Sequence, residues 1–279
     1  MWVDSMKNRR RIIEIFKATL LIIGLIFVAI PFAWILLTAF KRPVDAASVP
    51  PLIFSPFTLD NFRALKSDEY IGSLINSVTI TFLATTTTLF FGVPAGYAFA
   101  RGNFRGRRFF GAFLLFSRMV PPVIYIIPLF LFFHKLHLIG TFTGLTLAYL
   151  TGLLPFTVWM SASYFQDIPT ELEEAGRIDG CNRMQAFALI ALPLAMPGVI
   201  SVGLLICIAA WSEYFIPMLL GGPTTSPATV GIVNFIGVDS INWGAMCAGA
   251  LTLIIPVFIL TLLAQRGLLS GLTAGAIKG

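Results

Sequence analysis

Charged side chains are scarce in this chain: Asp, Glu, Lys and Arg together make up only 11% of its 279 residues. A soluble domain carries about 25% charged residues. Hydrophobic residues reach 57%, and the mean hydropathy is +0.88. These values exclude an ordinary soluble domain and favour the membrane class, in which ~20 uncharged residues cross the hydrocarbon as one helix.

Cysteine, histidine and nucleotide-binding motifs are also rare or missing. Cys181, Cys207 and Cys247 have no metal-binding spacing, so we expect free, inert thiols. His134 and His137 lie three apart with no Cys or carboxylate to complete a metal shell. No G-x-x-x-x-G-K-[ST] or H-E-x-x-H sequence occurs. We therefore expect no catalytic residue, no metal and no cofactor in this chain, and no enzyme activity of its own.

Long uncharged stretches recur along the whole chain and predict a single all-α integral membrane domain over residues 1–279. The six predicted transmembrane helices cover 18–40, 71–100, 109–133, 138–166, 193–220 and 241–265. The first is too long for the apolar core of a signal peptide, which has about 7–15 residues. Gly92 and Gly96 form a G-x-x-x-G in the second helix, a weak signal of close helix contact.

Lysine and arginine are unevenly distributed between the connecting segments. If the N-terminus is inside, the inner segments 1–17, 101–108, 167–192 and 266–279 hold 13 of them, and the outer segments hold five. Because cytoplasmic loops of membrane proteins are enriched in Lys and Arg, this split predicts both termini inside. The net charge of +6 is thus an orientation signal, and no nucleic-acid partner is expected.

The inner loop 167–192 carries seven charged residues between the fourth and fifth predicted spans. Thr170 and Glu173 have the spacing of a capping box, which predicts a helix from Glu171 to Asp179. Within it, Glu173 and Arg177 are spaced for an i,i+4 ion pair. Gly180 suits the left-handed position that ends a helix. This helix is either a docking surface or an ordinary amphipathic connector.

The same loop also predicts a helix face of mostly small residues and a second helix that leads into the fifth span. The predicted helix places Leu172, Ala175, Gly176 and Asp179 on one face, where small side chains allow close approach of a partner. Asn182 can cap a second helix that runs toward Pro193 and the fifth span. The charged loop therefore predicts two helices joined by a turn.

The spacing of this loop resembles the EAA loop of ATP-binding-cassette importer permeases, whose pattern is E-A-A, three residues, G, nine residues, I-x-L-P. The matching positions are Glu174, Ala175, Gly180, Ile190, Leu192 and Pro193. Gly176 departs, because the family usually has a second Ala there. A glycine keeps the surface small but loosens a helix by ~1 kcal/mol relative to Ala.

The resemblance extends over nearly the whole chain and is to the sugar-importer branch. It is carried by PPLIFSPFTLDNF (50–62), LINSVTIT (74–81), AGYAFAR (95–101), MVPPVIYIIPLF (119–130), LPFTVWM (154–160), AAWSEYF (209–215) and GLTAGAIKG (271–279). Six spans without a large outer domain are similar to the second permease of maltose-type heterodimeric pairs. The resemblance implies a carbohydrate importer that works by alternating access in a bacterial or archaeal cytoplasmic (inner) membrane.

The same resemblance implies partners and contact residues. The partners are a second homologous permease, two ATPase subunits that bind ATP and Mg²⁺, and an extracytoplasmic solute-binding protein. Residues 171–181 would be the helix that docks on the ATPase. The implied ATPase-coupling residues are Glu171, Glu173, Glu174, Ala175, Gly176, Arg177, Asp179 and Gly180. The tail 266–279 would reach the ATPases through Gly275, Lys278 and Gly279. The alternatives are a permease for another small solute and a carrier or channel without an ATPase.

Polar and aromatic residues inside the spans are candidates for the translocation path. Arg118 interrupts the third span, and a charge at that depth costs at least ~2.5 kcal/mol unless it faces the bundle interior or water. It either lines the path or pairs with carbonyls freed by the following prolines or with the second permease. Trp211, Glu213 and Tyr214 combine aromatic faces with a carboxylate, as sugar sites do; the alternative is that Trp211 and Tyr214 belong to an interfacial aromatic belt or simply pack.

Overall fold

The structure is a computed structural model that describes residues 2–237 and 241–276 and is built almost entirely of helices. Five helical segments are long and apolar enough to cross a membrane: Ile13–Ala39, Glu69–Arg101, Phe142–Gln166, Arg183–Trp211 and Trp243–Leu263. They belong to α1 (Trp2–Ala39), α4 (Asp68–Arg101), α7 (Phe142–Gln166), α10 (Leu192–Trp211) and α13 (Trp243–Ala276). Among the described residues the only β pairing is an isolated bridge between Ile236 and Ile241.

The third predicted span is not one continuous helix over 109–133. It consists of α5 (Arg107–Met119) and α6 (Pro122–Lys135), which are bent by 102°. Pro121 and Pro122 explain the break, because a residue that precedes proline is driven out of the helical region, and Val120 is extended. If this pair counts as one span, the total is six, as the sequence predicts.

The fifth predicted span, 193–220, also has different limits. Helical structure begins earlier, with α9 (Arg183–Ala186) and the π-helix η1 (Phe187–Ala191), and continues through α10 to Trp211. A π-turn directly before Pro193 fits the missing amide hydrogen of that proline. The chain then leaves the helical region, and α11 (Phe215–Leu220) is a separate helix.

A glycine at every fourth position after Arg266 predicts a tail that is a poor isolated helix and easily extended. Instead, α13 continues as a helix to Ala276 and includes Gly275. Lys278 and Gly279 lie outside the described residues.

The chain divides into two compact units. The first comprises residues 1–66 and 235–252, with α1, α2 (Pro43–Ala46), α3 (Asp60–Ala64) and the start of α13. Buried Asn61 donates from its side-chain amide to the carbonyls of Ala39 and Lys41, at 2.9 and 2.7 Å. These bonds satisfy the carbonyl of Ala39, which the end of α1 leaves without a helical partner, and that of Lys41 just beyond the helix.

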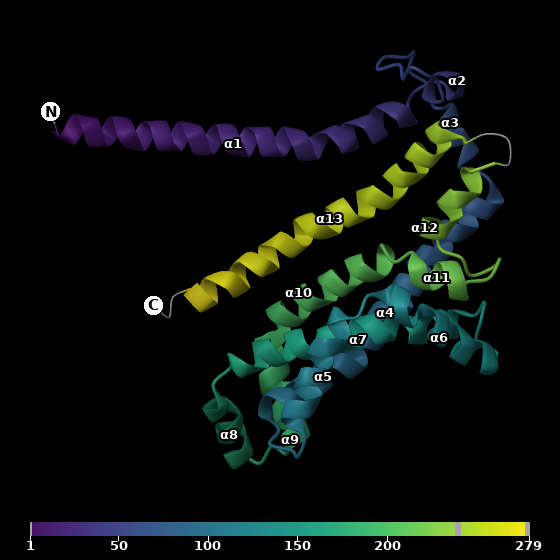
Figure 1. The fold of residues 1–279 in the computed structure, drawn as a ribbon. Coiled ribbons are helices and arrows are strands. Elements are labelled where there is room, and N and C mark those ends of the chain that lie inside the picture. Colours follow the sequence, from purple (N-terminus) through teal and green to yellow (C-terminus); the bar gives the residue numbers. More distant parts are fainter. Residues whose placement is uncertain (1, 238–240, 277–279) are drawn as a thin grey trace. The chain divides into compact units, whose positions relative to one another are not determined.

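The second unit comprises residues 67–234 and 253–279. Within it α4 packs along α7, and α10 packs against both (Figure 1). A Cβ atom built on Gly92 would lie 2.5 Å from Thr157 Cγ2, and one on Gly96 would lie 2.6 Å from Ser161 Cβ. The predicted contact role of this G-x-x-x-G is confirmed, because both glycines lie where α4 and α7 approach closely.

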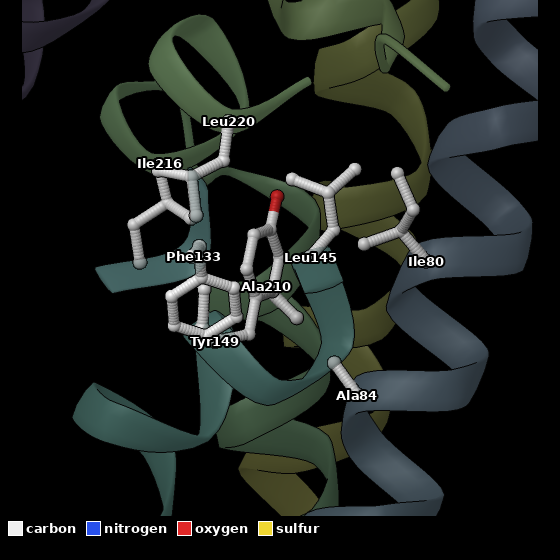
Figure 2. Close-up of a cluster of buried hydrophobic side chains, with 9 residues drawn as sticks. Ile80, Ala84, Phe133, Leu145, Tyr149, Ala210, Ile216 and Leu220 are labelled. Atoms are coloured by element: carbon white, nitrogen blue, oxygen red, sulfur yellow. The ribbon is translucent and has the colours of Figure 1, made fainter. Parts of the chain in front are cut away.

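Two apolar clusters hold the helices of this second unit together. One joins α4, α6, α7, α10 and α11 and is shown in Figure 2, where the ring of Tyr149 stands among Leu145, Phe133 and Ala210. The other contains Val93, Phe165, Phe187, Ala191 and Ala195, with Tyr97 packed against it. The second cluster fixes the end of α4 next to the charged loop.

Candidate functional site

The charged loop forms helix α8 (Thr170–Ile178), within one residue of the predicted helix at each end. It lies with α9 at one end of the α4, α7 and α10 group (Figure 1). The predicted capping box is wrong: Pro169 is the N-cap, Thr170 is already helical, and no side chain caps the first turn. Glu173 is unavailable for that role because its carboxylate is bonded to α4.

Glu173 is buried and connects α8 to the last turn of α4. Tyr97 Oη donates to Glu173 Oε2 at 2.5 Å, and Arg101 Nε donates to Glu173 Oε1 at 2.8 Å. Arg101 also donates from Nη2 to the carbonyl of Ile168 at 2.7 Å. The side chains of Arg101 and Glu173 are only 16% and 9% exposed. The predicted pair of Glu173 with Arg177 is therefore replaced by an ion pair with another helix.

Gly176 also faces the body of the protein rather than a partner. A Cβ atom at this position would lie 2.2 Å from Ile190 Cδ1 of η1, and Gly176 is buried. The prediction that Gly176 belongs to a face open to a partner is therefore wrong. The residues of this segment that are exposed are Glu171, Leu172, Glu174, Ala175, Arg177, Ile178, Asp179 and Gly180.

The end of α8 has the geometry predicted from its glycine. Gly180 has φ +100°, the Cys181 amide donates to the Gly176 carbonyl, and the Gly180 amide donates to the Arg177 carbonyl. This is a Schellman motif, which satisfies the terminal carbonyls of a helix. Asn182 caps α9 as predicted, and it forms a reciprocal capping box with Gln185.

A cavity of about 580 Å³ opens beside α8, between it, the end of α4 and α9. Arg177 and Arg183 line it together with Glu173 and Glu174, so its wall carries charges of both signs. Among the residues that the structure describes, no three His, Cys, Asp or Glu side chains are grouped to hold a metal ion.

Arg118 lies in the last turn of α5, just before the sharp bend. Its side chain is exposed, and its guanidinium carbon lies 4.5 Å from the centre of the Phe156 ring on α7. A cation at the C-terminus of a helix is favourable to the helix dipole, and the aromatic face adds a cation–π contact. Arg118 has no carboxylate partner in the described part of the chain.

Trp211, Glu213 and Tyr214 lie at the break between α10 and α11. Trp211 is buried and donates from Nε1 to the carbonyl of Leu253, at 3.1 Å. Glu213 Oε1 accepts from the amides of Phe215 and Ile216, so it caps α11. Tyr214 packs its ring edge-on to Phe215. Two of these three predicted path residues therefore have structural bonds within this chain.

Sequence reasoning assigned no role to Tyr97 and Arg101. They are four residues apart in the AGYAFAR segment and therefore lie on one face at the C-terminal end of α4. A tyrosine and an arginine at this spacing, facing a loop rich in Glu, are a signal that could have indicated an acidic partner. Only the fold shows that the partner is Glu173.

Long apolar helices, a proline-bent span and a short charged helix fixed to one end of the helix group define a membrane transport subunit. The model of the family "Binding-protein-dependent transport system inner membrane component" matches residues 92–266. The chain belongs to this family: it is an inner-membrane permease subunit of an ATP-binding-cassette importer, and it is not an enzyme.

Known proteins resemble the chain over nearly its full length. The trehalose/maltose transport system permease protein MalG of Thermococcus litoralis is 37% identical, covering 95% of this chain and 99% of that protein. The diacetylchitobiose uptake system permease protein DasC of Streptomyces coelicolor is 34% identical, covering 94% and 95%. A chain in the crystal structure of a bacterial ABC transporter involved in the import of the acidic polysaccharide alginate superposes with a TM-score of 0.77 at 26% identity, covering 92% and 96%.

Proposed function

We propose that this chain is one of two permeases of a carbohydrate importer and that α8 is its coupling helix. The single observation that carries the proposal is α8 itself, a short helix with an exposed acidic face, fixed at the inner end of the bundle. Relatives named for trehalose/maltose and diacetylchitobiose support the carbohydrate class. The partners are a second permease, two ATPase subunits that bind ATP and Mg²⁺, and an extracytoplasmic binding protein.

The exposed face of α8 is the surface that an ATPase would contact. Glu171, Glu174 and Asp179 are exposed there and have no ion-pair partner in the described part of the chain. A basic groove on the ATPase is complementary to these charges, and electrostatic complementarity mainly sets register and association rate. Gly275, Lys278 and Gly279 of the tail are proposed as a second contact.

The transport path runs through the bundle, with Arg118 as its charged residue. Arg118 is exposed and lies at a bend, and a charge within a span must reach water or protein. Tyr214 is half-buried and offers aromatic surface for sugar C–H groups, whereas Glu213 and buried Trp211 act through the fold.

The test is reconstitution with the cognate ATPases, second permease and binding protein in proteoliposomes. The binding protein is first screened with maltose, trehalose, diacetylchitobiose and an alginate oligosaccharide, and the sugar that binds is used for uptake. We expect ATP-dependent uptake that Glu174→Lys reduces about tenfold, because reversing one charge at an interface costs on the order of 1–3 kcal/mol.

Asp167→Lys is the matched control, because Asp167 is also an exposed acidic residue and lies just before α8. It should transport normally. Uptake without any ATPase would contradict the importer mechanism. Unchanged uptake in Glu174→Lys would contradict the assignment of α8.

A further inference from the structure

Helix α8 is attached to its own chain at two points, both on the side of the helix that faces α4 and η1. The first is the Glu173 clamp, which we define as Tyr97, Arg101 and Glu173 with their two hydrogen bonds. The second is the contact of Gly176 with Ile190 in η1. One point leads to α4 and the other leads through η1 to α10, so α8 is connected to two spans.

The Glu173 clamp is a strong connection by its chemistry. Both bonds end on a carboxylate, and hydrogen bonds to an ionised group are shorter and about twice as strong as neutral ones. Since Arg101 and Glu173 are largely buried, removing one partner would leave the other charge without compensation. Separation of α8 from α4 is therefore costly.

The clamp is also held in place by aromatic packing. The Tyr97 ring centre lies 5.3 Å from that of Phe165 on α7 and 4.7 Å from that of Phe187 in η1. This packing fixes the direction of the Tyr97 hydroxyl before it meets Glu173. The second hydrogen bond of Arg101, to Ile168, ties the same arginine to the segment that leads into α8.

We infer that Glu173 is a positioning residue that locks α8 to α4, so that α8, the end of α4 and η1 move as one rigid body. The resemblance implied that Glu173 contacts the ATPase. Instead, Glu173 is buried against α4, and its exposed neighbour Glu174 makes that contact. The inference rests on the proposed function, because it assumes that an ATPase displaces α8. Without the Glu173 clamp, α8 would keep only its contact with η1, and less of that displacement would reach α4.

The experiment measures whether α8 moves relative to α4 during the ATPase cycle. Spin labels are placed on the native Cys181, just after α8, and on Phe91→Cys, an exposed position of α4, with Cys207 and Cys247 replaced by Ser. The complete complex is measured by double electron–electron resonance without nucleotide and with ATP and vanadate. We expect one narrow distance that is the same in both states.

The variants Tyr97→Phe and Glu173→Gln should change this behaviour. We expect a broadened or nucleotide-dependent distance and a fall of about tenfold in binding-protein-stimulated ATP turnover, within the usual range of coupling energies. The amount of co-purified ATPase should stay the same, because the outer face of α8 is intact. Tyr97→Phe removes one hydroxyl only and therefore guards against a folding defect in Glu173→Gln.

Tyr164→Phe and Asp167→Asn are the matched controls, because they remove a hydroxyl and a charge near α8 without touching the clamp; both should behave as the unmodified chain. An unaltered distance and turnover in both clamp variants would overturn the inference, as would a nucleotide-dependent distance in the unmodified chain. An unmodified chain that recruits no ATPase would instead overturn the proposed function, and the inference with it.

Discussion

Gly180 is the residue whose backbone most restricts substitution in α8. Its φ of +100° is disfavoured for any residue with a Cβ, although no atom lies within 4 Å of the place where a Cβ would stand. Gly180→Val should therefore cost roughly 1–2 kcal/mol through backbone strain alone and misplace the turn into α9. ATPase co-purification and uptake by the complete importer would both decrease.

Gly180→Asn is the matched variant, because asparagine tolerates positive φ better than other residues with side chains. It should retain most of the uptake that Gly180→Val loses. Equal losses in both variants would show that the side chain meets a partner surface rather than that the backbone is strained.

Arg118 is a charged residue within a predicted span, and no carboxylate of the described chain neutralises its charge. It has an aromatic face beside it, and its side chain is exposed. On the proposal that Arg118 lines the path, we expect Arg118→Ala to abolish sugar uptake or change its specificity while the complex still assembles. Phe156→Leu removes only the cation–π contact, worth ~0.5–1 kcal/mol, and should have a weaker effect. Loss of assembly with normal transport by the remaining complex would assign Arg118 a structural role.

At the scale of helices, the contact of α4 with α7 depends on glycine. Gly96 approaches the backbone of α7, with the Ala162 nitrogen and the Val158 carbonyl oxygen both 3.0 Å from a Cβ placed on it. Backbone cannot move aside as a flexible side chain can, so Gly96→Leu should cost at least ~1–3 kcal/mol through overpacking. The thermal stability of the purified complex would fall.

Gly72→Leu is the control on the same helix, because no atom lies within 4 Å of a Cβ at Gly72. Its effect should remain within ~0.5 kcal/mol, as for surface positions. If both substitutions destabilise the complex equally, the close approach of α4 and α7 is not the cause.

The sequence predicts helices well where the cause is local and less well where it is tertiary. The turn at Gly180 and the cap at Asn182 depend on neighbouring residues, and both were correct. The capping box at Thr170 failed because Glu173, its required partner, is bound by Tyr97 and Arg101 more than 70 positions earlier. A pattern of neighbouring residues cannot show that such distant side chains compete for the Glu173 carboxylate.

The same distinction between local and tertiary causes applies to the spans. Apolar length located them, but length says nothing of direction, so it predicts one span over 109–133 and not two helices bent by 102° at Pro121 and Pro122. Likewise, the glycine repeat after Arg266 suggested an extended tail, whereas the helix that precedes it continues to Ala276. In each case the course of the chain is set by what precedes or packs against it.

For the whole molecule, orientation in the membrane remains a prediction, and it rests on the 13 to five distribution of Lys and Arg. With the N-terminus inside, the loop that contains Asn103 and helix α8 face the ATPase side, and the segment around Thr224 faces the binding protein. The reverse orientation would place the exposed acidic face of α8 where no ATPase exists. The coupling role of α8 therefore requires this orientation of the chain.

Single cysteines at Thr224 and Asn103 test this orientation, in a chain whose Cys181, Cys207 and Cys247 are replaced by Ser. Both positions are exposed, so their reactivity reports the side of the membrane rather than burial; Ser226 is less suitable because it is half-buried and its hydroxyl donates to Gly222. A membrane-impermeant maleimide should label Thr224→Cys in intact cells and Asn103→Cys only after permeabilisation. The opposite pattern would refute the inside position of the N-terminus and, with it, the contact of α8 with an ATPase.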